Sequence, residues 1–161
     1  MMEINQLPVI KIKRIKEQSF SINETLFSDV STFVKIEIGQ RLSFAIEENL
    51  VAISIRFYYH YPEDNSDQII AEINVQNVYE IPGLSSFYIS SNEIKLPKET
   101  IINIVGVSIS HTRALLAKNL LGTSLQDNLP AIVNPEEVAK HFFPRMFDIE
   151  DLGQTIVDAP Y

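Results

Sequence analysis

LVAISIRFYYHY, residues 50–61, is the stretch of sequence that most strongly indicates the fold. Apolar and polar side chains alternate along it, and this period of two places one set on each face of a β-strand. One face carries Val51, Ile53, Ile55, Phe57 and Tyr59, and the other carries Ala52, Ser54, Arg56 and Tyr58. β-Branched and aromatic residues are enriched in strands, so the composition supports the same prediction.

Three further segments alternate in the same way, at residues 6–23, 33–46 and 68–81. The first changes phase near Ile15, which indicates an irregularity, and Gly39 in the second is a candidate bulge or bend. The link PEDNSD before the last segment has the Pro, Asn and Asp content of a hairpin loop. A four-stranded antiparallel meander is therefore predicted.

A long connection and a long helix are predicted after the strands. Residues 82–97 contain Pro, Gly and four serines and resemble the loops that carry function in compact domains. Pro97 begins the helix and Gly122 ends it. One side of this helix carries Ile101, Val105, Ser108, Thr112, Leu115, Leu116 and Asn119. Because its first half is apolar nearly all round, we expect cover from its own sheet and from another subunit.

A second, shorter helix is predicted from the sequence NPEEVAKHFF. Asn134 is its N-cap, Pro135 its first residue, and the helix is expected to end near Pro144. The fold class is thus α+β, with a single domain over residues 1–161. Residues 144–161 are expected to form an acidic, flexible tail.

Composition and charge limit the classes of function that the chain can have. The chain has 161 residues and no cysteine, which excludes disulfides, thiolate nucleophiles and cysteine-based metal sites. It has 13 Lys+Arg against 21 Asp+Glu, and its formal charge of −8 disfavours sequence-independent nucleic-acid binding. No signal sequence and no run of ~18 apolar residues is evident, so a cytoplasmic protein without membrane insertion is expected.

Motifs for catalysis or cofactor binding are absent from the sequence. The three histidines are far apart and form no metal-binding spacing. No nucleophile elbow, phosphate-binding loop or dinucleotide fingerprint occurs. We therefore expect no metal, no cofactor and no enzymatic activity, with His111 at an interface or on the surface. An enzymatic alternative would need His60 or Arg56 in a cavity beside an acid.

The order of elements, together with particular residues, resembles the SecB family of export chaperones. The similarity runs from about Ile12 to Phe143. The matching pieces are IKRI, SFSI, VKIEI, LVAISIRF, AEINVQNVYEI with Pro82 and Gly83, and TRALLAKNLLGTS followed by NLPAIVNPEEV. In the last piece Arg113, Gly122, Thr123, Leu129, Val133 and Asn134 fit the end of the family's long helix and the link to its last helix.

The resemblance implies a four-stranded antiparallel sheet with a long crossover loop and two C-terminal helices on one face. It also implies an ATP-independent holdase that binds unfolded or nascent polypeptides in apolar grooves beside the crossover loop. The candidate groove residues are Leu84, Phe87, Tyr88 and Ile89 in the loop, with Val138, Phe142 and Phe143 on the last helix.

Assembly and partners are further implications of the resemblance. The family forms a dimer of dimers through edge strands and the long helix, for which Ile101, Val105, Ile109, His111 and Leu116 are the candidate interface residues. An apolar residue and an acid on the fourth strand help the family dock the SecA motor, and Ile70 and Glu72 match that pair.

The chain departs from the export members of the family at the end of the first strand. Ser19 and Asn23 stand where those members have acids that face SecA. A SecB-like chaperone dedicated to one partner, such as an antitoxin, is therefore an alternative to a general export chaperone. A second alternative is an interaction protein without general chaperone activity.

Overall fold

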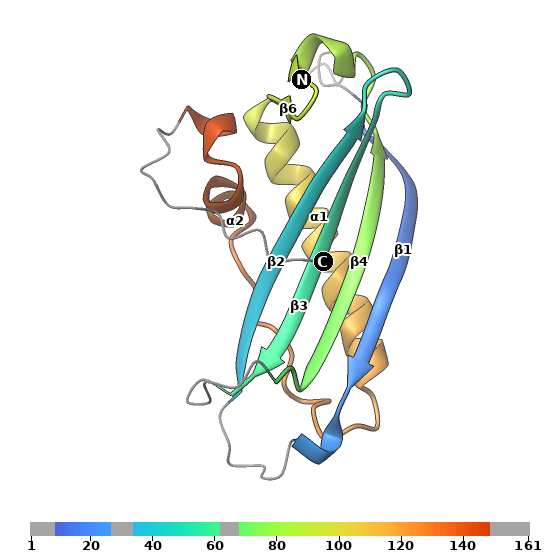
Figure 1. The fold of residues 1–161 in the computed structure, drawn as a ribbon, viewed down its shortest axis with the longest axis vertical. Helices are drawn as coiled ribbons and strands as arrows, with labels where there is room; N and C mark the ends of the chain where they lie inside the picture. The colour runs from blue at the N-terminus through green and yellow to red at the C-terminus, as the bar shows by residue number, and fades with distance from the viewer. Residues whose placement is uncertain (1–8, 27–33, 62–67, 149–161) are drawn as a thin grey trace, which may run out of the picture.

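A computed structural model describes residues 9–26, 34–61 and 68–148 of the chain. Its main sheet contains β1 (Lys11–Ile22), β2 (Lys35–Ala45), β3 (Leu50–His60) and β4 (Ala71–Glu80), all antiparallel. The predicted fold class is confirmed: a four-stranded sheet with two helices on one face, the arrangement that the resemblance to the SecB family implies (Figure 1).

The predicted meander is wrong in one respect, which is the position of the first strand. The order across the sheet is β1-β4-β3-β2, so β1 pairs with β4 and not with β2. Alternation predicts strands but does not specify their neighbours, and β2, β3 and β4 already form consecutive hairpin pairs. β1 occupies the edge that these hairpins leave open, and β1 and β2 are the two edge strands.

Irregularities in the strands lie partly where the sequence predicts them. The register of β1 against β4 shifts between Ile12 and Arg14 and again between Glu17 and Ser19, on either side of Ile15. The expected bulge at Gly39 does not occur, because β2 pairs with β3 without a shift and Gly39 lies opposite Arg56.

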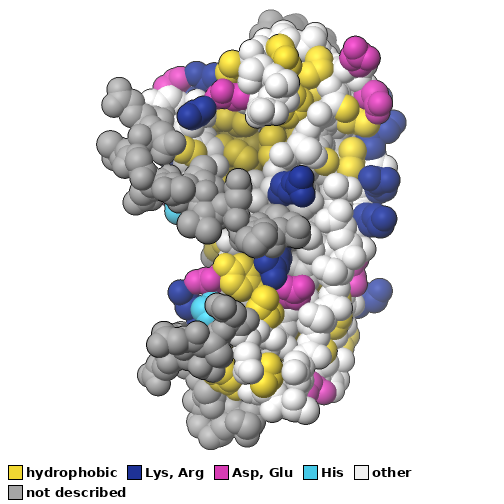
Figure 2. Space-filling view, in the orientation of Figure 1, with side chains coloured by type: hydrophobic (Ala, Val, Ile, Leu, Met, Phe, Trp, Pro, Cys, Tyr) yellow, Lys and Arg dark blue, Asp and Glu magenta, His cyan; other side chains and the backbone are white. Residues whose placement is uncertain are grey.

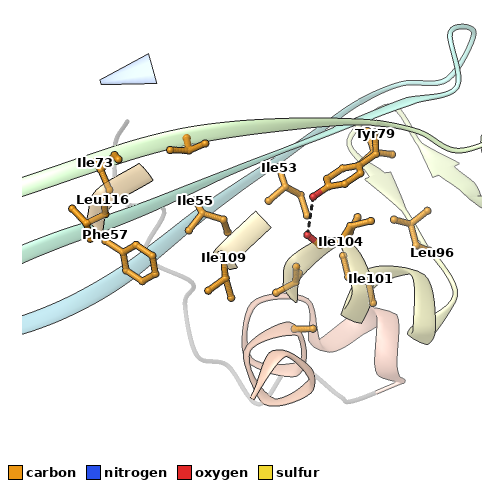
Figure 3. Close-up of a cluster of buried hydrophobic side chains, with 14 of the residues drawn as sticks. Ile53, Ile55, Phe57, Ile73, Tyr79, Leu96, Ile101, Ile104, Ile109 and Leu116 are labelled. Atoms are coloured by element: carbon orange, nitrogen blue, oxygen red, sulfur yellow. Dashed lines mark hydrogen bonds between the residues drawn. The ribbon is translucent and has the colours of Figure 1, made fainter. Parts of the chain in front are cut away.

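The core lies between the sheet and α1 (Lys98–Leu120), which packs on β3 and β4 and reaches β1. The five apolar residues of β3 that alternate in the sequence are between 0% and 4% exposed, which confirms which face of the strand is buried. Ile53, Ile55 and Phe57 meet Ile101, Ile104, Ile109 and Leu116 of α1 in this layer (Figure 3). Burial of apolar area here supplies most of the fold's stability.

The crossover connection contains short elements of its own. They are a 3₁₀ turn η3 (Leu84–Phe87) and a two-stranded ribbon formed by β5 (Tyr88–Ser90) and β6 (Glu93–Ile94). Gly83 precedes the turn with a φ of 75°, a left-handed conformation that glycine adopts at little cost. The connection therefore leaves β4 by a sharp turn before the chain enters α1.

The C-terminal part agrees with the predicted helix boundaries. Gly122 follows α1 with a φ of 79°, as a C-terminal glycine does. α2 (Pro135–Phe142) is capped by the side chain of Asn134, which accepts a hydrogen bond from the Glu136 amide at 2.9 Å. A short 3₁₀ turn, η4 (Pro144–Phe147), follows it, and another, η2 (Glu24–Leu26), follows β1.

The first residues of the predicted tail, 144–148, contain the turn η4. Met146 and Phe147 are 7% and 8% exposed, so η4 packs into the core and residues 144–148 belong to the fold. Pro144 ends α2 but does not end the packed structure. The rest of the predicted tail, residues 149–161, lies outside the described residues.

α1 is the single helix within the described ranges that is long and apolar enough to span a membrane by length and composition. One side of it packs on the sheet, where Ile101, Leu116 and Leu120 are fully buried. A helix in a protein core satisfies this test as readily as a membrane span does.

Candidate functional site

The edge strand β2 carries an apolar stripe that is less covered than its neighbours. Ile36, Ile38, Leu42 and Phe44, here called the β2 stripe, point to the helix side and are half-buried. Their partners on β3 are almost fully buried, because α1 lies over β3 and β4. The stripe therefore forms an accessible apolar surface at the margin of the core.

The backbone of β2 adds a second feature to this surface. One side of the strand pairs with β3, and no other strand among the described residues pairs with β2. An edge strand presents N–H and C=O groups on which an extended chain can add as a strand. The side chain of Gln40 lies within the stripe, and its Oε1 is buried without a hydrogen-bond partner among the described residues.

Two ion pairs hold the crossover connection against the C-terminal segment. Lys95 pairs with Asp148, and Arg145 lies 3.5 Å from Glu93. The pairing with Lys95 lowers the pKa of the Asp148 carboxyl, which is exposed. The connection after β4 and the turn after α2 therefore lie together, although more than 50 residues separate each pair in the sequence.

The predicted groove residues fall into three groups. Tyr88 and Ile89 are 49% and 53% exposed, and four side chains are half-buried: Phe87, Val138, Phe142 and Phe143. Leu84 is fully buried, so its prediction as a groove residue is wrong. It follows the turn at Gly83, and its amide donates to Oδ1 of Asn49, which directs the side chain into the core.

The predicted interface residues of α1 are mostly core residues. Ile101, Val105, Ile109 and Leu116 are at most 6% exposed against the protein's own sheet, so they cannot contact another subunit. The sequence pattern identified the buried side of the helix and assigned it to the wrong partner. The side of α1 away from the sheet instead exposes Asn103, Val107, Ser110, Ala114 and Lys118.

His111 has a structural environment. It is half-buried on α1, and its Nδ1 lies 2.6 Å from Oδ1 of Asn77, a fully buried residue of β4. The Nδ2 of Asn77 has no hydrogen-bond partner among the described residues. His111 therefore links the helix to the sheet. The sequence analysis predicted an interface or surface position for His111 and did not predict this contact.

The predicted motor-docking pair does not form one exposed surface. Ile70 is 1% exposed and belongs to the core, so the expectation that it faces outward is wrong. It precedes β4, where its amide donates to the carbonyl oxygen of Tyr59. Glu72 lies on the sheet face that the helices leave open, and it forms an ion pair with Arg56.

The histidine and arginine that an enzyme would need lie on that same open face. His60 Nε2 is 3.2 Å from Glu37 and Arg56 pairs with Glu72, so each has an acid beside it but not in the interior. A hydrogen bond from Lys35, followed by one from Tyr58, lowers the pKa of Glu37 to about 2. Burial and the hydrogen bond to Glu37 raise the pKa of Tyr58 to about 12. Within the described ranges, no cluster of three metal-binding side chains occurs.

The β2 stripe is the feature that the sequence analysis missed. Its residues were identified as one face of a strand, and a strand of that pattern is normally covered by the helices of the domain. Only the order of the strands places β2 at an edge beyond α1. The exposed neighbours Tyr88 and Ile89 were found because they stand in a loop rich in serine.

Two of the solved structures that match this chain have low sequence identity to it. A SecB-like chaperone from Mycobacterium tuberculosis, solved in complex with a ChAD peptide from the HigA1 antitoxin, is 8% identical over 77% of this chain and 84% of that chain, with a TM-score of 0.45. A protein of unknown function from Streptococcus agalactiae is 9% identical over 79% of this chain and 97% of that chain, with a TM-score of 0.36. No family model and no curated protein matches the sequence.

Proposed function

We propose that this protein is an ATP-independent holdase chaperone that binds unfolded or nascent polypeptides along the β2 stripe. The observation that carries the proposal is a half-buried apolar row on an edge strand whose outer side pairs with no strand in the described part of the chain. An extended client can pair with the strand and place alternate side chains on the stripe. The exposed aromatic Tyr88 and its neighbour Ile89 extend the apolar surface in the crossover connection.

The energetics favour weak, reversible binding. Full burial of a leucine-sized side chain contributes about 1.5–3 kcal/mol, whereas ordering one residue of an unfolded client costs about 1–2 kcal/mol. A short client segment therefore gains little net free energy, and a long unfolded chain that offers several apolar segments gains more. This balance selects unfolded over folded proteins, and release needs no nucleotide.

The kind of polypeptide that the proposed chaperone binds is inferred from the family resemblance. Clients are unfolded or nascent proteins, as in SecB-dependent export, and an antitoxin is the alternative dedicated client. The M. tuberculosis protein was solved with an antitoxin peptide. We propose that this chain is a homo-oligomer, with the exposed side of α1 as its contact, and that SecA docking is absent because Ile70 is buried. We place the protein in the cytoplasm and assign it no cofactor and no catalytic activity.

Aggregation of a chemically denatured enzyme, followed by light scattering, tests the proposal. The wild-type protein is expected to suppress scattering without ATP at a near-stoichiometric ratio. Leu42→Asp and Tyr88→Asp are expected to lose most of this suppression, because a carboxylate would be desolvated by a bound client. Ser43→Asp is the matched control, since Ser43 is the next residue of β2 and is exposed on the other face.

Two outcomes would overturn the proposal. One is a properly assembled wild-type protein that leaves aggregation unchanged, and the other is full suppression by both the Leu42→Asp and Tyr88→Asp variants. Leu42→Ser and circular dichroism control for unfolding of the half-buried site. Stoichiometric capture of one folded partner, without affinity for denatured chains, would assign the protein to the dedicated interaction class.

A further inference from the structure

The open face of the sheet, which neither α1 nor α2 covers, has a chemistry that the proposed function does not use (Figure 1, with α1 behind the sheet). Pairing across the four strands arranges its side chains in rows. Lys16, Gln76, Ser54 and Arg41 form one row from β1 to β2. The row on one side runs from Arg14 through Val78 and Ala52 to Ser43, and the row on the other runs from Ser19 through Asn74 and Arg56 to Gly39.

These three rows, here called the basic platform, contain four cations and no acid. Arg14 donates a hydrogen bond to Gln76, and Arg56 pairs with Glu72 of the next row. Lys16 and Arg41 are exposed, and within the described part of the chain no carboxylate lies within ion-pair distance of either. Three strand spacings of about 4.8 Å separate them, which makes about 14 Å.

The platform is unusual for a chain with a formal charge of −8. Seven of the 13 Lys and Arg residues lie on the open face: Lys11, Lys13, Arg14, Lys16, Lys35, Arg41 and Arg56. Among the described residues this face carries three acids, Glu37, Glu72 and Glu80, and they lie in the outer rows. Lys and Arg side chains follow the β1 side of the molecule in the space-filling view (Figure 2). The other acids of the described residues lie off this face, and screening over about 10 Å limits their effect on it.

We propose that the basic platform docks an acidic, extended segment of a partner polypeptide. Two carboxylates four residues apart in an extended chain are about 13 Å from each other, which matches the span from Lys16 to Arg41. Gln76 lies half-buried between these cations, and its side-chain NH2 group can donate a hydrogen bond to the backbone of the segment. Electrostatic complementarity of this kind sets partner choice and association rate.

A polypeptide fits the platform better than a nucleic acid does. Single-stranded nucleic acids bind by stacking on several aromatic side chains, and within the described residues Tyr58 is the only Phe, Tyr or Trp on this face. A long polyanion would also extend over the acidic remainder of the molecule. The platform and the β2 stripe lie on opposite faces, so a partner and an unfolded client can bind together.

Fluorescence anisotropy with the full-length protein tests the inference. The probe is a labelled peptide of Ser and Gly with Glu at every fourth position, measured at about 20 mM salt so that screening is weak. The same peptide with Gln is expected to bind at least about tenfold more weakly, as is the Glu peptide at about 300 mM salt. Binding of the Gln peptide as tightly as the Glu peptide would overturn the proposal.

Two charge-reversal variants locate the binding site. Lys16→Glu with Arg41→Glu is expected to weaken binding of the Glu peptide by more than about tenfold. Lys98→Glu with Arg145→Glu makes the same change of net charge on exposed residues outside the platform and outside the proposed contact on α1, and is expected to change binding by less than about twofold. Equal losses in the two variants would overturn the assignment to the platform. Lys16→Gln with Arg41→Gln repeats the test if the reversal disturbs folding.

Two further measurements examine other occupants. The first is the affinity for oligothymidine. If oligothymidine binds more tightly than the Glu peptide, and the Lys16→Glu, Arg41→Glu variant loses that binding, the occupant of the platform is a nucleic acid and not a polypeptide. A variant neutralised at Glu150, Asp151 and Asp158 that binds the probe about tenfold more tightly would assign the platform to the chain's own C-terminus. Unchanged suppression of aggregation by the Lys16→Glu, Arg41→Glu variant is expected, and it separates this inference from the proposed function.

Discussion

The two faces of the main sheet come from the same four strands and have opposite chemistry. Along β3, Ile53 and Ile55 point into the core, whereas Ser54 and Arg56 point to the open face. The covered face buries apolar area and excludes charge, while the open face keeps cations in contact with solvent. The buried contacts that stabilise the fold are thus concentrated on one face. Side chains on the other face can change with less effect on stability. The three predictions below test this division.

The largest difference in the free energy of unfolding is expected between substitutions at two neighbouring residues of β3. Ile53→Ala should lower the free energy of unfolding by about 2–5 kcal/mol, because it removes buried methyl groups and leaves a cavity. Ser54→Ala should lower it by less than about 1 kcal/mol, since the Ser54 hydroxyl makes only a 3.4 Å hydrogen bond to Gln18. Urea denaturation measures both, and similar losses would contradict the division between the faces.

An intermediate effect is expected at a buried hydroxyl pair. The hydroxyl of Tyr79 lies 2.6 Å from Oγ of Ser108 and donates to the carbonyl oxygen of Ile104 (Figure 3). Burial raises the pKa of Tyr79 to about 12, so this hydroxyl stays protonated at neutral pH. Tyr79→Phe should cost about 1–3 kcal/mol, because buried polar groups lose a partner.

A double variant distinguishes this hydrogen bond from packing. Adding Ser108→Ala to Tyr79→Phe removes one of the unpaired groups, so it should cost less than the sum of the two single changes. Tyr58→Phe on the open face is the counterpart, expected to cost less than about 1 kcal/mol. Chemical denaturation of the wild type and the four variants measures these differences, and additive costs of Tyr79→Phe and Ser108→Ala would show that the pair does not interact.

The smallest effect is expected on the open face and depends on pH. The pKa of Glu37 is lowered from 4.5 to about 2, so its charged form stabilises the folded state above pH 4.5, and this contribution is lost as the pH falls through 2. Glu37→Gln should therefore be slightly less stable than the wild type at neutral pH and equal to it near pH 2. Thermal unfolding over this range measures the difference, and a constant offset would exclude the proton linkage.

Local patterns of sequence were sufficient to predict the elements. Alternation located all four strands, and Pro97, Gly122 and Asn134 marked helix ends that the structure confirms. The boundaries depend on residues close together in the sequence, which is why local rules suffice. The position of β1 beside β4 depends on contacts between distant residues, and no pattern within β1 specifies them.

The candidate site was predictable only in its loop residues. Tyr88 and Ile89 were singled out as apolar residues in a polar connection, and they are exposed. Leu84, Ile70 and the four predicted interface residues of α1 are apolar too. They are buried because elements distant in the sequence pack against them, which no local pattern shows. The basic platform combines residues from all four strands, so it is apparent only after the strand order is known.

The pairing of β1 with β4 also determines the order in which the protein can fold during synthesis. β1 leaves the ribosome first, but Lys11 pairs with Glu80 and Ile22 with Ala71, so its partner is made much later. β2 and β3 can form their hairpin as soon as both have emerged, and pairing between residues close in sequence is fast. The N-terminal strand thus waits unpaired while the rest of the sheet assembles. Lysines along β1 protect it from association with other chains during this interval.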